Sequence, residues 1–228
     1  MQRDARTTNG ISADQPIFIG RPTAVAEAKP SPPYMVHTRN FFYFGVRYAP
    51  AAARAALPDG LHPLADCSGV IGIYTAPEGW GLAPLRGTFF GISVSDQVAP
   101  DGSPTVFMAE QVLDGPGKVI FHDDYNLRVR HGVTQTSREG NTAFGEMRSD
   151  AGPELEIEAI PRFDETYPPT SGLHYYLGEA KGRGVNIFSV AFTARFIPAD
   201  ILRFNILDSA SARLKSLKPV HVDWATFI

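Results

Sequence analysis

The chain has 228 residues but a single cysteine, Cys67. One cysteine excludes an intrachain disulfide and makes a cysteine-based zinc or iron–sulfur site untenable. No basic residue adjoins it in the segment LADCSGV. We therefore expect Cys67 to be a small, partly buried residue and not a reactive thiol.

Long apolar runs and an excess of one charge are also missing. The first residues, MQRDARTTNGISADQP, carry charges where a signal peptide needs an apolar core, and no uninterrupted apolar run approaches membrane-spanning length. The 21 basic and 24 acidic residues leave a net charge of −3, which argues against broad capture of nucleic acid or an anionic membrane. We expect a cytoplasmic protein whose partners are small molecules or further copies of itself.

Prolines punctuate the start of the chain. Five of them fall within residues 1–37, which predicts an extended N-terminal arm of the kind that wraps a neighbouring subunit. Residues 38–228 are predicted to form one domain, because β-rich barrels often reach this length as a single unit. The arm also favours a homo-oligomer.

Strand-like segments dominate the rest of the chain. The aromatic run 40–48 predicts a buried strand, and Pro50 suits the first turn of a short helix over 50–57. Further strands are predicted at 68–76, 88–95, 104–113, 117–125, 141–149, 154–160, 174–179, 185–196 and 220–228, with turns such as Pro77-Glu78-Gly79 between them. The stretch 198–217 mixes periods and is predicted to be partly helical. The fold class is mainly β, an antiparallel barrel or double sheet with a few short helices.

The segment from Pro33 to Leu64 carries a series of recognisable features. In order these are Pro33-Tyr34, His37, Arg39, the aromatic run 41–44, Arg47-Tyr48, the alanine-rich helix 51–57, and Pro58 with Leu61 and Leu64. This order resembles the opening of acetoacetate decarboxylases. The resemblance implies the acetoacetate decarboxylase-like fold more firmly than it implies an activity.

One binding residue follows from the resemblance by position. The arginine after the histidine contributes to the substrate site in that family, which implies the same role for Arg39. A guanidinium can hold a carboxylate through two parallel hydrogen bonds. The structural alternative is an arginine paired with a carboxylate or carbonyl groups of the protein itself.

The reactive lysine of the family has no counterpart. It normally lies in a Tyr/Phe-Pro-Lys segment, and the nearest match is Tyr125-Asn126-Leu127-Arg128, so Arg128 stands about where the lysine would be. A guanidinium stays protonated and cannot form an imine. Of the five lysines, only Lys118 adjoins a predicted central strand, so imine chemistry would require Lys118.

The family's early glutamates are missing as well. Between Cys67 and Asp96 the only carboxylate is Glu78, which is predicted at the tip of a turn. A turn tip is a poor place for a buried acid.

Polar residues recur in the segment 121–130. Side chains alternate along a strand, so His122, Asp124, Arg128 and Arg130 would share one face. If that face lines the barrel, Arg128 and Arg130 would join Arg39 in binding an acid, and His122, Asp124 or Tyr125 would transfer protons. If it faces water, the segment is an ordinary amphipathic strand.

Other constellations are weaker. A metal site built from His122 and Asp124 with His131 or His174 lacks any recognised spacing, so neither a metal nor another cofactor is predicted. No Gly-x-Ser-x-Gly elbow of a hydrolase occurs. The segment 174–176, with Phe188, Phe192 and Phe196, forms either an aromatic pocket or plain core.

Three functions remain open. The first is a lyase-like or isomerase-like enzyme that binds a small keto or hydroxy acid and uses no lysine imine. The second is a non-catalytic barrel that binds a small hydrophobic ligand. The third is a Schiff-base decarboxylase that uses Lys118.

Overall fold

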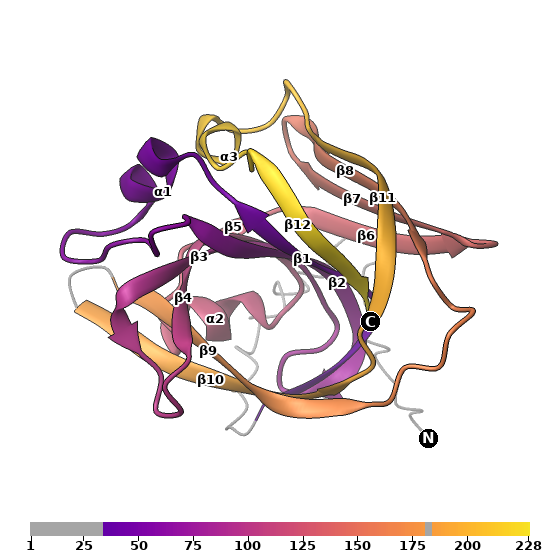
Figure 1. Ribbon diagram of the computed structural model, residues 1–228, viewed down its shortest axis with the longest axis horizontal. Helices are drawn as coiled ribbons and strands as arrows, with labels where there is room; N and C mark the ends of the chain where they lie inside the picture. The colour runs from indigo at the N-terminus through magenta and orange to yellow at the C-terminus, as the bar shows by residue number, and fades with distance from the viewer. Residues whose placement is uncertain (1–33, 181–183) are drawn as a thin grey trace, which may run out of the picture.

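The computed structural model describes residues 34–180 and 184–228. The predicted arm lies outside the described residues, except that strand β1 (Met35–Arg47) begins inside its last positions. The other elements, in chain order, are α1 (Pro50–Ala56), β2 (Ser68–Trp80), β3 (Leu85–Val98), β4 (Pro104–Asp114), α2 (Lys118–Asp123), β5 (Val129–His131), β6 (Val133–Glu139), β7 (Thr142–Ser149), β8 (Gly152–Pro161), β9 (Thr170–Ala180), β10 (Gly184–Ala194), β11 (Ile197–Ile206), α3 (Ala212–Ser216) and β12 (His221–Phe227) (Figure 1). None of the helices in these ranges has the length and apolar composition needed to cross a bilayer.

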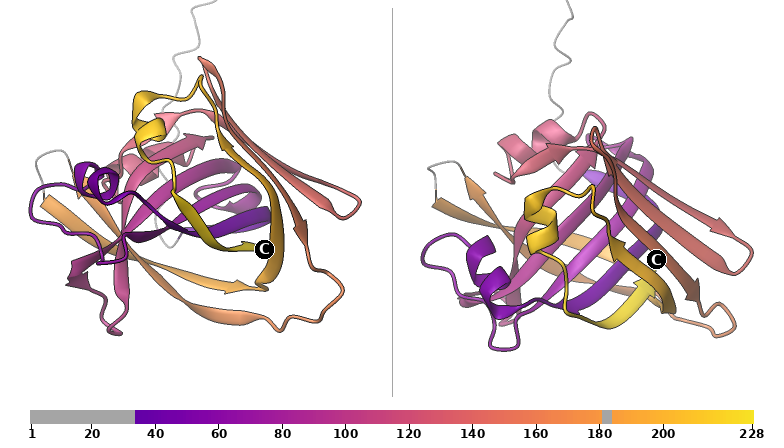
Figure 2. Two further views of the ribbon diagram at one scale, coloured as in Figure 1. Left: turned by 45° about the horizontal axis from the view of Figure 1, so that its top comes forward. Right: turned by 90° about the horizontal axis from the view of Figure 1, so that it is seen from above.

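The strands form one sheet of twelve. Its order is β10-β9-β4-β3-β2-β1-β12-β11-β8-β7-β6, with β5 added beside β4. Strand β4 runs parallel to β5 and β9, and the other pairs are antiparallel. The sheet is strongly curled, as the views in Figures 1 and 2 show. The mainly β fold class is confirmed.

Ring contacts show how tightly the sheet curls. Tyr43 of β1 lies 5.6 Å from His174 of β9 and 5.5 Å from Trp224 of β12, measured between ring centroids. In the strand order, β9 and β12 lie on opposite sides of β1. Strand β12 is the direct neighbour of β1, whereas β9 lies four places away, so His174 reaches Tyr43 only because the sheet bends into a half-barrel.

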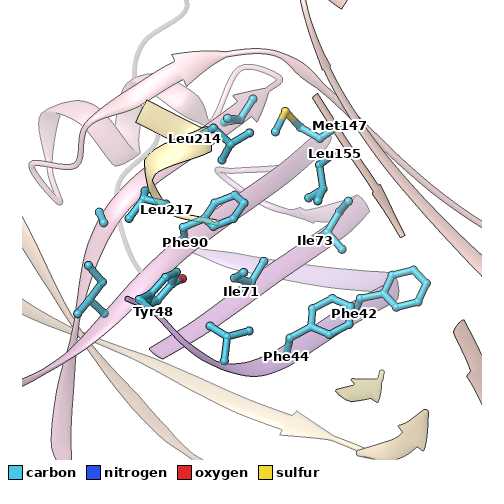
Figure 3. Packing of buried hydrophobic residues seen from close by; sticks show 14 of the residues in the cluster. Phe42, Phe44, Tyr48, Ile71, Ile73, Phe90, Met147, Leu155, Leu214 and Leu217 are labelled. Atoms are coloured by element: carbon cyan, nitrogen blue, oxygen red, sulfur yellow. The ribbon is translucent and has the colours of Figure 1, made fainter. Parts of the chain in front are cut away.

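Both faces of the central strands are buried, which explains the aromatic run in β1. Phe42, Phe44 and Val46 point to one face, where they meet residues from β7, β8, β11 and α3 (Figure 3). Phe41 and Tyr43 point to the other, concave face. Fully burying one such side chain contributes about 2–3 kcal/mol.

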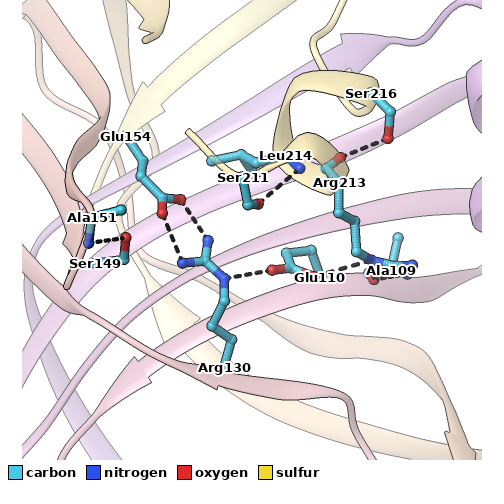
Figure 4. A network of polar contacts seen from close by, with 10 residues as sticks. All are labelled: Ala109, Glu110, Arg130, Ser149, Ala151, Glu154, Ser211, Arg213, Leu214 and Ser216. Carbon is cyan, nitrogen blue, oxygen red and sulfur yellow. Dashed lines mark hydrogen bonds and ion pairs between the residues drawn. The ribbon is translucent and has the colours of Figure 1, made fainter. Parts of the chain in front are cut away.

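On the Phe42 side of the central strands, a buried ion network joins β4 and β5 to β8 and α3 (Figure 4). The Arg130 guanidinium donates to both oxygens of Glu154, at 3.0 and 2.7 Å, and its Nε donates to Glu110 at 2.9 Å. Arg213 of α3 lies 3.1 Å from the second oxygen of Glu110. The two carboxylate side chains are only 1% and 7% exposed, so the arginines compensate charges that water does not reach.

Two predicted elements differ from the structure, one wholly and one in part. Residues 117–125 form helix α2 and not a strand, with the Asp124 amide donating to the Ile120 carbonyl. The place beside β4 is taken by β5 and β9, and Ile120 is buried on the concave side while Val119 is half exposed. A short apolar run fits either a strand or a helix, and here tertiary packing decides.

The second difference concerns the stretch 198–217: its predicted partial helix is confirmed by α3 near its end, but residues 197–206 form strand β11. A bulge between Ile201 and Arg203 interrupts its alternation, and this explains the mixed periods of the sequence. The only helix of that region in the described chain is α3. In addition, Glu78 lies within β2 and not at a turn tip, although it is exposed.

Candidate functional site

Three tyrosines gather on the concave face. Tyr43, Tyr74 and Tyr176 surround Phe89 with ring centroids 6.3, 6.4 and 6.2 Å from its own. Each tyrosine is at most 8% exposed. They come from β1, β2 and β9, so the curl of the sheet is what brings them together. We call these four residues, with His174, the tyrosine cluster.

Glycines on neighbouring strands make room for these rings. A Cβ at Gly72 would lie 2.2 Å from the Phe89 ring, and one at Gly87 would lie 2.9 Å from the Tyr74 hydroxyl. Gly72 pairs with Phe89 and Gly87 with Tyr74 across the sheet. The aromatic rings therefore lie flat over the glycine backbone, which fixes where the phenols point.

The phenols of the cluster keep their protons. Burial raises the pKa of Tyr43 to about 12 and also raises the pKa of Tyr74. The pKa of Tyr176 is well above its ordinary value, first through burial and then through its contact and hydrogen bond with Tyr43. Near neutral pH all three phenols are therefore protonated, and because Tyr43 and Tyr176 share one hydrogen bond, two phenol protons are left for another oxygen atom.

His174 completes the cluster at its partly exposed side. Its ring stacks on Phe192 at 4.4 Å and lies 6.0 Å from Tyr176. Burial lowers the pKa of His174 below its ordinary 6.5. The imidazole is therefore neutral near pH 7, the form that accepts a proton.

The predicted proton-transfer residues lie on and after α2, and of these only Tyr125 adjoins the tyrosine cluster, through Phe188, whose ring lies 4.8 Å from that of Tyr125 and 5.7 Å from that of Tyr176. His122 is exposed, and its Nδ1 lies 2.8 Å from a carboxylate oxygen of Asp123. Asp124 accepts a hydrogen bond of 2.8 Å from the Tyr34 hydroxyl, and Tyr125 packs edge-on against the Tyr34 ring at 6.2 Å. Because 118–123 is helical, His122, Asp124 and the arginines do not share the face that a strand would have given them.

The three predicted binding arginines are separated and paired with carboxylates of the protein. Arg39 donates to Glu78 at 2.7 Å, and both side chains are 65% exposed. Arg128 pairs with Glu179. Arg130 belongs to the ion network on the opposite side of the sheet. A role for these arginines in binding a ligand stays a prediction.

The described residues contain no group of three His, Cys, Asp or Glu side chains placed to hold a metal ion. His122 lies on α2 and His174 in the tyrosine cluster, so the alternative metal site is not assembled. An open hollow of about 250 Å³ lies elsewhere, over β6, β7, β8 and β11, and is lined by Glu146, Glu156 and Glu158. Its lining also includes Arg203, which lies 3.7 Å from both Glu156 and Glu158, so the three carboxylates outweigh the one cation and make the hollow a poor place for an organic acid.

The aromatic grouping seen in the sequence is only part of the site. His174, Tyr176, Phe188 and Phe192 pack together on the concave face, an arrangement that fits both the pocket and the plain-core alternative. No local pattern predicts that Tyr74 joins them. The one available signal is the repeated alternation of aromatic residues with glycine, as in GIYTA (72–76) and GTFFG (87–91).

No protein-family model and no curated protein sequence matches the chain. Solved structures do match it. The enduracididine biosynthesis enzyme MppR complexed with pyruvate has a TM-score of 0.65 at 14% identity, over 90% of this chain and 89% of that one. Acetoacetate decarboxylase from Legionella pneumophila has a TM-score of 0.61 at 14% identity, over 87% and 84%.

A third match is an acetoacetate decarboxylase-like enzyme from Sphingomonas wittichii, with a TM-score of 0.52 at 13% identity over 85% of this chain and 87% of that one. These three enzymes share a fold with the chain while sharing few residues. The protein thus has the acetoacetate decarboxylase-like fold, as the resemblance of its opening segment predicted.

Proposed function

We propose that the protein binds a small, neutral carbonyl compound on the concave face of its half-barrel and forms no imine with it. The observation that carries this proposal is the convergence of Tyr43, Tyr74 and Tyr176 around Phe89. Aromatic rings would hold the apolar body of the ligand, and the phenols would donate hydrogen bonds to its oxygen.

The charge of the surroundings favours a neutral ligand. The described chain has no buried lysine or arginine, and Arg130 is occupied by Glu110 and Glu154. A carboxylate buried without a cation loses its hydration without compensation. A ketone carbonyl needs only hydrogen-bond donors, which the phenols supply.

Replacing one phenol tests the site. In Tyr176→Phe, calorimetry with acetophenone should show an affinity about fivefold to tenfold lower, because one hydrogen bond to the carbonyl is lost. Tyr175→Phe is the matched control, since Tyr175 points to the other face of β9. Equal affinities of both variants and the unchanged protein would remove Tyr176 from the site.

The absence of an imine is tested separately. Lys118 is half-buried in the first turn of α2, and Lys215 and Lys218 are exposed. We expect borohydride treatment with acetoacetate to leave no adduct detectable by mass spectrometry. An adduct that Lys118→Arg abolishes would instead support the Schiff-base alternative.

A second candidate is lyase or isomerase chemistry at the same place, favoured by the position of His174. Its ring lies 5.6 Å from that of Tyr43 and 6.0 Å from that of Tyr176. A neutral imidazole there would remove a proton next to the ligand carbonyl, and the phenols would stabilise the enolate. Exchange of the acetophenone methyl protons in D₂O, followed by NMR, should then be accelerated and should slow in His174→Phe. If the exchange is not accelerated, the second candidate fails and only the binding function remains.

Acid binding through Arg39 can also be measured. Its pair with Glu78 is exposed to water, and such pairs contribute little, about 0–1 kcal/mol, so a ligand carboxylate could replace Glu78 at low cost. Arg39→Met should then weaken acetoacetate binding in calorimetry. An unchanged affinity would exclude Arg39 from an acid site.

A further inference from the structure

Gln111 of β4 is a buried polar residue outside the tyrosine cluster. Its side chain is 3% exposed, and its Oε1 atom has no hydrogen-bond partner within the described chain. A buried carbonyl oxygen left without a donor destabilises a protein by about 1–3 kcal/mol. Such a group calls for a partner that the described chain does not supply, either an ordered water or an atom of a ligand.

The strand pairing places Gln111 on the concave face. It lies opposite Phe89 of β3 and Val129 of β5, and directly opposed residues share a face. Phe89 and Val129 pack among the hydrophobic residues of the concave face, as does Leu113, which lies two residues further along β4. Gln111 therefore shares its face with the ring around which the three tyrosines gather.

The adjacent residue confirms the orientation. Glu110 points the other way, into the ion network with Arg130 and Arg213. Consecutive side chains on a strand point to opposite faces, so Gln111 is directed away from that network. The network thus offers no donor to its amide oxygen.

The two kinds of group on the concave face are complementary. The tyrosine phenols donate hydrogen bonds, whereas the Gln111 oxygen only accepts them. We propose that Gln111 is a specificity-determining residue that accepts a hydrogen bond from a hydroxyl group of the ligand. The ligand class is then a neutral hydroxy-carbonyl compound, with its carbonyl on the phenols and its hydroxyl on Gln111. This inference rests on the proposed function.

Two probes of nearly equal size test it. By calorimetry, para-hydroxyacetophenone should bind the unchanged protein about tenfold more tightly than para-methylacetophenone, which lacks the donor. Gln111→Met removes the acceptor at similar volume and should abolish this preference. Gln135→Met is the matched control, because Gln135 is exposed on β6, and it should keep the preference.

The outcomes separate the two proposals. Equal affinity of both ketones for the unchanged protein overturns the role of Gln111 without any variant, so a variant that fails to fold does not block the test. A preference that persists in Gln111→Met also overturns it. If acetophenone binds through Tyr176 while the hydroxyl gives no advantage, only this inference fails. If none of the ketones binds, the proposed function fails and this inference fails with it.

Discussion

Arg130 holds two buried carboxylates, and without it Glu154 would be uncompensated inside the protein. Its two terminal guanidinium nitrogens donate to the two carboxylate oxygens of Glu154 at 3.0 and 2.7 Å, and the Glu154 side chain is 1% exposed. Removing one partner of a buried ion pair is costly because the remaining charge keeps its desolvation penalty. The network therefore belongs to the stability of the fold.

Glu154→Gln should accordingly lower the free energy of unfolding by about 3 kcal/mol, measured by urea denaturation. Glu156→Gln serves as the control, because Glu156 lies 3.7 Å from Arg203 with a side chain that is 40% exposed, and it should change stability by less than about 0.5 kcal/mol. Similar values for the two variants would show that the network contributes little.

His174 should make stability depend on pH. Burial lowers its pKa below 6.5 in the folded protein, so the unfolded chain takes up this proton at a higher pH than the folded chain does. The unfolding free energy therefore falls as the pH drops through 6.5, and the contribution of the neutral imidazole is complete above it. In His174→Phe this part of the pH dependence should disappear from urea unfolding curves. A variant with the same pH profile as the unchanged protein would contradict the assignment.

At the scale of elements, the turn between β4 and α2 is tightly constrained. Gly115 has a φ of +116°, and a Cβ there would lie 2.2 Å from the Pro84 carbonyl oxygen. Gly140, between β6 and β7, also has a positive φ, +59°, but a Cβ there meets nothing within 4 Å. Comparing substitutions at the two glycines therefore distinguishes the cost of a positive φ from the cost of a steric clash.

Gly115→Ala should lower the melting temperature well beyond Gly140→Ala. In Gly140→Ala the free energy of unfolding should fall by about 1 kcal/mol, because alanine disfavours a left-handed backbone. In Gly115→Ala a steric clash is added, and the free energy of unfolding should fall by about 3 kcal/mol. Calorimetric melting curves give both values. Equal costs would mean that the turn shifts to admit a side chain.

The same scale shows where prediction from sequence succeeds. The strands with strong alternation or dense aromatic content, such as 68–76 and 88–95, were predicted because burial on one or both faces leaves a pattern. Helix α2 was missed because its short apolar run also fits a strand, and β11 because its bulge breaks the period of two. Local sequence holds too little information to decide either case.

At the scale of the molecule, the tyrosine cluster depends on contacts that are remote in sequence. Tyr43, Tyr74 and Tyr176 meet only because the sheet curls, and the sequence around each tyrosine does not predict that curl. The fold class could be predicted because it follows from the number and spacing of strands together with the opening segment. The site could be predicted only in part, through His174 and Tyr176.

The edge of the sheet bears on the predicted homo-oligomer. Strand β10 ends the strand order, has no charged residue over Gly184–Ala194, and exposes Ile187 by 46% and Val190 by 43%. An uncharged edge strand of this length tends to pair with an edge strand of another molecule. We expect two copies to pair through β10, giving a dimer in light scattering.

Ile187→Lys should shift that equilibrium toward the monomer, because two charges would face an apolar edge. Leu202→Lys, at a residue 56% exposed on β11 inside the sheet, should leave the dimer intact. A monomer for the unchanged protein would refute the expectation.

The most direct test of a neutral ligand on the tyrosine cluster is the ratio of two dissociation constants. Acetophenone and benzoate are similar in size, and only benzoate carries a charge. Because the phenols donate hydrogen bonds and no cation of the described chain is buried, acetophenone should bind at least about tenfold more tightly in calorimetry. Benzoate binding as tightly as acetophenone, or more tightly, would contradict a neutral carbonyl ligand and point back to an arginine-bound acid.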